Sequence, residues 1–306
     1  MSGPEAFLLT VIPAATPLLL AATGELVVER AGVLNLGVEG MMVTGAVCAF
    51  AAAAASGNPW LGIVAGAAAG ALLALPFAAL TQWLATNQVA TGLALTLFGL
   101  GLSGLIGEPF VGQPGVRLAR LAVPGLSDLP FVGPVLFGHD VLVYASFALT
   151  AGVAWFLFRS RAGLVLRAIG SNHDAAHALG HRVVRTRFLA ILFGGALAGL
   201  AGAHLSLSYT PQWVENMTAG RGWIALALVV FATWRPLRVL AGAYLFGAVW
   251  ILGLYVQALG FGLPSQLLTA LPYIVTIVAL VIISRNRTLT LTNTPASIGI
   301  PFVPDR

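Results

Sequence analysis

The chain has 306 residues, of which 58% are hydrophobic before its 36 glycines are counted, and only 8% are charged. Soluble domains average about 45–50% apolar residues with glycine included and about 25% charged residues. This composition excludes a soluble globular protein and predicts a polytopic membrane protein. All fifteen basic residues behind the net charge of +5 are arginines, and they cluster in particular loops. We attribute them to membrane topology and not to nucleic-acid binding.

The first apolar run, 6–22, is expected to be a retained span, because no basic segment or A-x-A cleavage site accompanies it. Glu25 and Glu29 follow four residues apart, so they share one face of the short amphipathic cytoplasmic segment expected at 24–31. The string GVLNLGVEG at 32–40 then precedes a short apolar run. This glycine-rich start is typical of a broken helix.

Apolar runs long enough to cross a bilayer predict further spans at 60–80, 89–106, 141–158, 188–207, 239–259 and 267–284. A proline-rich stretch without helical periodicity, 108–140, is expected to be an extracytoplasmic loop. The apolar run at 223–234 is short, and such runs are more often re-entrant or broken than spanning. With the broken segments included, the sequence predicts an all-α fold of about nine transmembrane helices, within a range of eight to ten.

The most polar stretch, 159–187, lies between two of these spans and carries six of the fifteen arginines. Short arginine-rich loops face the cytoplasm, so this stretch orients every other span. The N-terminus is then expected outside and the C-terminus inside. Of all the arginines, this topology leaves outside only Arg117, Arg120 and Arg221.

Two short segments interrupted by glycine, 32–45 and 220–234, stand in the two halves of the chain. Such a pair predicts an internal repeat with a transport site near its interface. We treat 1–287 as a single transmembrane domain, with a cytoplasmic loop at 159–187. The remainder, 288–306, is expected to be a disordered cytoplasmic tail.

The string SNHDAAHALG inside the cytoplasmic loop predicts a helix of about two turns, with a Ser or Asn N-cap, an acid in the first turn and a glycine stop. It is similar to the EAA loop of ABC-importer permeases, whose pattern is Glu-Ala-Ala, three residues, then Gly. Here Asp replaces Glu, and no Ile-x-Leu-Pro tail follows. The motif alone does not separate a coupling helix from a plain surface helix. As a coupling helix, it would contact an ATPase through Ser171, Asn172, Asp174, Ala175, Ala176 and Gly180.

Longer strings carry a wider resemblance: GELVVERAGVLNLGVEGMM, NQVATGLALTLFGLGLSG and ENMTAGRGWIALALVVFATWRPL. They resemble the branched-chain amino acid, ribose and simple-sugar permease family. Within it, the chain looks most like the smaller permease of bacterial nucleoside and simple-sugar ABC importers. The resemblance spans about 15–285 and implies a multi-pass subunit of the bacterial inner membrane, surrounded by membrane lipid.

The resemblance also implies partners. They are a second, related permease forming a heterodimer, an ABC ATPase that binds ATP and Mg, and an external lipoprotein that delivers substrate. No cofactor is then expected on this chain, and the chain itself is not expected to be an enzyme.

Polar residues near the spans are candidates for a translocation path. An ionisable or polar group at membrane depth costs free energy, so such groups are rare and mark functional sites. These residues could instead have structural roles. Glu39 could pair with Arg30 or with backbone, and the threonine hydroxyls could bond to their own helix. Three tryptophans, at 213, 223 and 234, could stack on a nucleobase or anchor at the interface. The path candidates are Asn35, Glu39, Asn87, Thr91 and Thr96.

Other chemistries lack their motifs. The sequence contains no GxxxxGK[ST] phosphate loop, no HExxH and no paired-cysteine metal site. His173, His177 and His181 recur every four residues, and we interpret them as solvated side chains and not as metal ligands. An ion-coupled secondary transporter is the alternative function. It would need ionisable groups inside several spans, and only Glu39 and His204 qualify in the sequence. Glu215 and Arg221 are expected to form an exposed outer pair.

Overall fold

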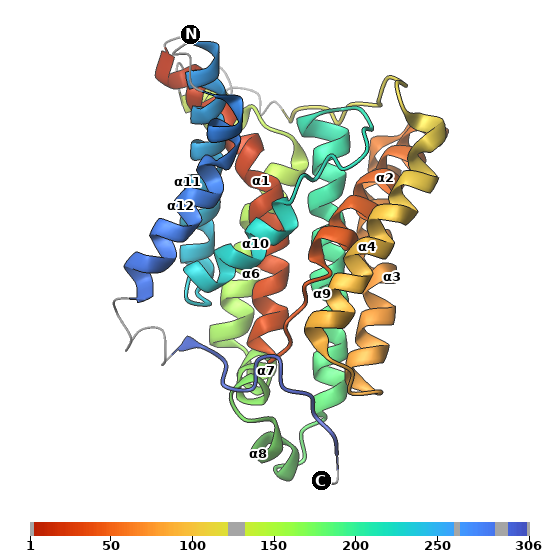
Figure 1. Cartoon of the computed structure of the whole chain (residues 1–306), viewed down its shortest axis with the longest axis vertical. Coiled ribbons are helices and arrows are strands. Elements are labelled where there is room, and N and C mark those ends of the chain that lie inside the picture. Colours follow the sequence, from red (N-terminus) through yellow and green to blue (C-terminus); the bar gives the residue numbers. More distant parts are fainter. Residues whose placement is uncertain (1–2, 122–131, 260–263, 285–292, 305–306) are drawn as a thin grey trace.

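The computed structural model describes residues 3–121, 132–259, 264–284 and 293–304, and these residues form helices and no strands (Figure 1). The prediction of an all-α polytopic protein is confirmed. Seven helices are long and apolar enough to cross a membrane. They are α1 (Gly3–Arg30), α2 (Val38–Ser56), α3 (Pro59–Gln82), α4 (Gln88–Gly107), α6 (Val141–Arg159), α9 (Val183–His204) and α11 (Pro236–Ala258).

The remaining elements are shorter or lie at the periphery. Counting α10 and α12 with the seven long helices accounts for the nine predicted spans, although the exact number of crossings stays a prediction. These elements are η1 (Glu108–Phe110), α5 (Val132–Phe137), α7 (Arg161–Ser171), α8 (His173–Ala178), the π-helical η2 (Leu205–Tyr209), α10 (Arg221–Phe231) and α12 (Ser265–Ser284). The loop predicted at 108–140 therefore contains η1 and α5.

Side-chain caps explain where several helices begin. Asn87 accepts a hydrogen bond from the Ala90 amide at 3.0 Å and starts α4. Asp140 accepts from the amides of Leu142 and Val143 and starts α6. Each cap satisfies amides that have no partner within their own helix.

The prediction of an amphipathic cytoplasmic segment at 24–31 is wrong. Helix α1 continues without a break to Arg30, and both Glu25 and Glu29 are buried. Their carboxylates accept hydrogen bonds from the Asn35 amide and the Trp234 indole. An i, i+4 pair of acids is compatible with a solvated face, but here it forms a polar seam inside the bundle.

Helices α1 to α4 and helices α9 to α12 form two units that run in opposite directions, and α6 packs against α1 beside them (Figure 1). Helix α3 packs on α9 as α11 packs on α1, and α2 packs on α9 as α10 packs on α1. This exchange of corresponding contacts is the arrangement expected of an inverted internal repeat. Each unit contributes one helix that follows a non-helical segment, α2 and α10.

The disordered tail expected at 288–306 is also corrected in part, since 285–292 and 305–306 lie outside the described residues. Residues 293–304 fold back along the end of the molecule that carries α7 and α8 (Figure 1). The Ser297 amide donates to the Gly170 carbonyl at 2.9 Å. Residues 293–304 therefore form a strap against α7 and α8.

Glycines allow backbone contact between α9 and its neighbours. A Cβ atom on Gly199 would lie 2.1 Å from the Gly66 carbonyl oxygen, far inside van der Waals contact. We expect Gly199→Leu to destabilise the protein by about 3 kcal/mol, a fall of about 5–10 °C in melting temperature. The measurement is thermal unfolding in detergent.

The matched control for this prediction is Gly101→Leu, because a Cβ atom there meets nothing within 4 Å. Both changes replace a helical glycine by the same side chain, so helix propensity cancels between them. Equal melting temperatures of the two variants would contradict the close contact of α9 with α3.

Candidate functional site

Helices α2 and α10 both begin part-way along the neighbouring long helices, after non-helical segments at 31–37 and 210–220 (Figure 1). Non-helical backbone at membrane depth is tolerated only where protein or a water-filled cavity satisfies it. The two helix starts meet each other: a Cβ atom on Gly222 would lie 2.7 Å from the Glu39 amide nitrogen. The broken segments expected from the sequence are therefore present and adjacent.

Glu39 joins these two starts. It lies in the first turn of α2, and its side chain crosses to the beginning of α10. Oε1 accepts from the Thr218 hydroxyl at 2.6 Å and the Gly220 amide at 2.8 Å, and Oε2 accepts from the Gly222 amide at 2.6 Å. Helix N-termini carry partial positive charge and unpaired amides. One buried carboxylate thus serves two converging helix ends, and Arg30 is not its partner.

Side chains from α1, from α4 and from the loop itself fix the α1–α2 loop. Asn35 is buried, its amide donates to Glu25, and its Oδ1 accepts from the Gly37 amide at 2.9 Å. The Thr96 hydroxyl donates to the Leu36 carbonyl at 2.9 Å. Asn35 and Thr96 therefore position backbone, and the structure brings both close to the Glu39 segment.

Asn87 and Thr91 lie apart from this group, at the beginning of α4. The Thr91 hydroxyl donates to the Asn87 carbonyl at 2.8 Å and lies 3.0 Å from the Thr86 hydroxyl. Both hydrogen bonds are local to the start of the helix. A role of any of the five candidates in contacting substrate stays a prediction.

The three tryptophans have different environments. Trp213 is buried against Gly107, and the indole of buried Trp234 donates to Glu29. Trp223, on the first turn of α10, keeps 47% of its surface exposed. Of the three, only Trp223 presents a ring that a solute could stack on.

The prediction that Glu215 and Arg221 form an exposed outer pair is wrong. Arg221 is buried at the start of α10, and its guanidinium lies 4.6 Å from the centre of the Trp250 ring and 5.6 Å from that of Tyr209. Among the described residues it forms no ion pair with Glu215, which is exposed. The cation is stabilised by ring faces and by the Met217 carbonyl.

The short helix predicted in the arginine loop is α8. Asn172 is its N-cap and accepts from the Ala175 amide at 2.9 Å, while Ser171 is the last residue of α7. Gly180 has a φ of +86°, the left-handed conformation of a helix stop. Asp174 and Ala175 face solvent, but Ala176 is buried and so is not available to a partner.

The prediction that His173 is solvated is wrong. The residue begins α8, and its side chain is buried. Burial, followed by the charge of Arg187, lowers its pKa below the ordinary value. The ring is therefore neutral at pH 7, and its Nδ1 accepts from Arg187 Nη2 at 3.1 Å. No group of three His, Cys, Asp or Glu side chains in the described ranges could hold a metal ion.

Arg187 is the residue that sequence reasoning missed. It was counted as a topology signal, yet its side chain has no exposed surface. Nε donates to the Ala31 carbonyl at 3.0 Å, and Nη1 donates to the Ile300 carbonyl at 3.1 Å. With His173, these contacts join α9, the α1–α2 loop, the C-terminal strap and α8. The predicted span begins at residue 188, and only the start of α9 at Val183 places this arginine within a membrane-length helix.

Arg30 makes a second link at the same end of the bundle as Arg187. Its Nε and Nη2 both donate to the Trp234 carbonyl, at 3.1 and 2.7 Å. Thr233 and Trp234 have φ values of 49° and 52°, a left-handed conformation that costs non-glycine residues energy. The end of α1 therefore holds the strained turn between α10 and α11.

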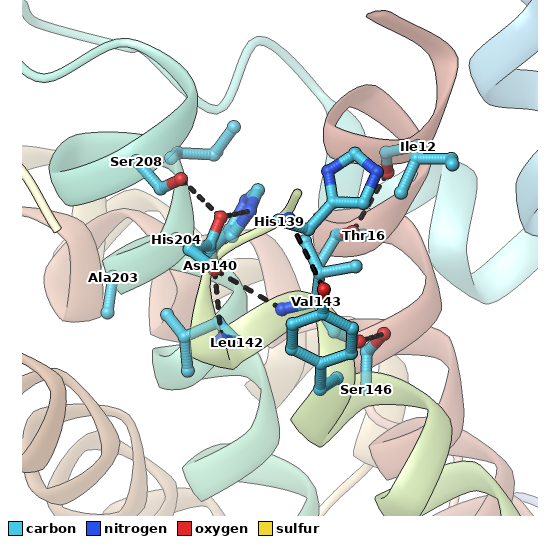
Figure 2. Close-up of polar contacts among 12 residues, drawn as sticks. Ile12, Thr16, His139, Asp140, Leu142, Val143, Ser146, Ala203, His204 and Ser208 are labelled. Carbon is cyan, nitrogen blue, oxygen red and sulfur yellow. Dashed lines mark hydrogen bonds and ion pairs between the residues drawn. The ribbon is translucent and has the colours of Figure 1, made fainter. Parts of the chain in front are cut away.

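A third polar cluster lies at the opposite end of the bundle (Figure 2). Asp140 Oδ2 accepts from the Ser208 hydroxyl at 2.6 Å and lies 3.4 Å from Nε2 of buried His204. Burial by itself would raise the Asp140 pKa, but His204, Ser208 and the Val143 amide outweigh it and hold the pKa below its ordinary value. His204, a sequence candidate for ion coupling, thus ties α9 to the start of α6.

The family of the permease component of branched-chain amino acid transport systems matches residues 7–283. The chain belongs to this family. Among its relatives is TsgC13 of Haloferax volcanii, an ABC transporter permease protein named provisionally for glucose, with 46% identity over 86% of this chain and 81% of that protein. The guanosine ABC transporter permease NupQ of Bacillus subtilis is 31% identical over 94% and 93%. A second guanosine permease of that organism, NupP, is 25% identical over 82% and 74%.

As an ABC transporter permease, the chain is a multi-pass transport component and not an enzyme. Membership of the family displaces the ion-coupled alternative. Glu39 and His204 are not the only buried ionisable groups of the spans, because Glu25 and Glu29 are buried as well. Their hydrogen bonds to Asn35 and Trp234 assign them to holding loops.

We expect Glu39→Gln to destabilise the permease by about 3 kcal/mol, because an amide group replaces one acceptor oxygen and faces backbone donors. The measurement is thermal unfolding of the purified protein. Glu108→Gln, the same change at an exposed carboxylate, should leave the melting temperature unchanged. Equal stability of the Glu39 variant and wild type would contradict the bridging role.

Proposed function

We propose that this permease is a membrane subunit of an ATP-driven importer for uncharged sugars or nucleosides. The observation that supports this substrate class is the Glu39 carboxylate at the starts of α2 and α10. In transporters with broken helices, exposed helix N-termini bind anionic groups of the substrate. Here a protein carboxylate already uses those amides.

An anionic solute would therefore meet a buried negative charge where a free helix terminus would otherwise attract it. Branched-chain amino acids carry a carboxylate, whereas glucose and guanosine do not. The names of TsgC13 and NupQ agree with this distinction. Half-exposed Trp223 offers a ring face of the kind that stacks on sugars and bases.

The partners follow from the family. We infer a heterodimer with a second permease, because this chain resembles both guanosine permeases of Bacillus subtilis. ATP and Mg bind to a separate ATPase, and an external lipoprotein delivers substrate. We place the N-terminus outside and the strap inside, because α7, α8 and the arginine loop lie at the end opposite the N-terminus (Figure 1).

The proposed coupling runs through α8. ATP binding moves the ATPase against the exposed residues Asp174, Ala175 and Gly180. The displacement passes from His173 to Arg187, and from Arg187 to the Ala31 carbonyl. That carbonyl begins the loop leading to Glu39, so motion of α8 reaches the paired helix starts.

Substrate class is tested with the complete importer in proteoliposomes supplied with ATP. We expect accumulation of labelled glucose or guanosine at least about tenfold above that of leucine or glucose 6-phosphate, a difference of about 1.4 kcal/mol. Vesicles without ATP are the control. Leucine uptake as fast as that of the neutral solutes would overturn the substrate assignment.

Coupling is tested at Leu179, the residue before Gly180, whose side chain is 78% exposed at the end of α8. Leu179→Glu should remove the ATPase from a detergent pull-down of the tagged permease, because a charge replaces an apolar contact. Leu237→Glu is the matched control, since Leu237 is 75% exposed at the start of α11. Retention of the ATPase by the Leu179 variant would contradict the role of α8.

A further inference from the structure

We propose that the C-terminal strap, residues 293–304, is part of the ATPase-docking surface and completes a pocket beside α8. This inference rests on the proposed function and adds a second element to the coupling helix. The pocket has a volume of about 500 Å³ and is lined by the α8–α9 turn, the start of α9, the end of α3 and the strap. His177 and Gly180 line it and also belong to the coupling segment, so the two surfaces are continuous.

The strap is built into this region and not merely laid over it. The ring of Phe302 is only 5% exposed and packs with Ile169, Ala176 and Val183. Its centre lies 5.3 Å from that of His173 and 5.2 Å from that of His177, in edge-on contact. Ile300 upstream is held by Arg187 through its carbonyl.

These contacts matter because α8 has only six residues. A helix of this length is not stable by itself in water and takes its position from tertiary packing. Its buried side consists of His173 and Ala176, and both face Phe302. The small size of Ala176 therefore serves the strap and not the ATPase. Phe302 sets where the exposed side of α8 points.

The lining of the pocket specifies the partner's chemistry. Arg182 and Arg185 provide two exposed cations on one side. Trp83 and Phe188 form a stacked apolar wall, with ring centres 5.4 Å apart and planes at 22°. The pocket thus fits a segment of the ATPase that carries acidic side chains around an apolar one. Charge complementarity of this kind favours one partner over others.

The test measures the affinity of the purified ATPase for the detergent-solubilised permease pair. Phe302→Ala should weaken it about tenfold or more while the second permease stays bound. Val111→Ala is the control, because Val111 is 55% exposed and follows η1, outside both the strap and the α8 region. The double variant Arg182→Glu, Arg185→Glu should weaken binding similarly without touching Phe302, since both side chains are exposed.

Leu179→Glu separates the two levels of the proposal. If it abolishes ATPase binding while the Phe302 and arginine variants bind like wild type, the strap is only packing and this inference is overturned, whereas the proposed function stands. If all three bind like wild type, the docking role proposed for α8 fails together with this inference, because the ATPase then binds elsewhere. If no ATPase binds to the wild-type permease pair, the proposed function itself fails. If the arginine variant instead loses bound anionic phospholipid and keeps the ATPase, the pocket is a lipid site and the inference is overturned.

Discussion

The structure depends on one buried carboxylate between two helix N-termini. Glu39 supplies three acceptor contacts to Thr218, Gly220 and Gly222, and these satisfy amides at the start of α10. Hydrogen bonds to a charged group contribute about 1.5–3 kcal/mol each, and buried amides without them are costly. Because α2 and α10 are corresponding helices of the two opposed units, this single side chain links the units at the point where both helices are interrupted.

The other buried polar groups also join segments. Glu29 and Arg30 hold the turn after α10. Asp140 and His204 connect the start of α6 to the end of α9. Arg187 joins α8 to the α1–α2 loop. Each of these contacts joins segments that are far apart in the sequence, so the buried polar groups hold the helices and loops in register. In the described part of the chain, no group of three His, Cys, Asp or Glu side chains could hold a metal ion.

Features encoded by neighbouring residues were predictable. Apolar length gave the spans, Asn87 and Asn172 mark helix starts, and Gly180 marks a stop. What failed depends on contacts between distant residues. The carboxylates four apart in α1 have the same local pattern whether they face water or Asn35 and Trp234. Likewise, the Arg187 contact with Ile300 spans 113 positions, so charge counting could not reveal it. The strap was misjudged for the same reason.

The glycine contacts around α9 have a mechanical consequence. Gly199 meets the backbone of α3 and Gly45 that of α9, with no side chains between them that could deform. Backbone pressed on backbone resists sliding, because a small shift brings carbonyl oxygens into overlap. We expect α2, α3 and α9 to keep their positions relative to one another during transport. The helices that move are then α10 to α12, which pack less closely and include a strained turn at Thr233 and Trp234.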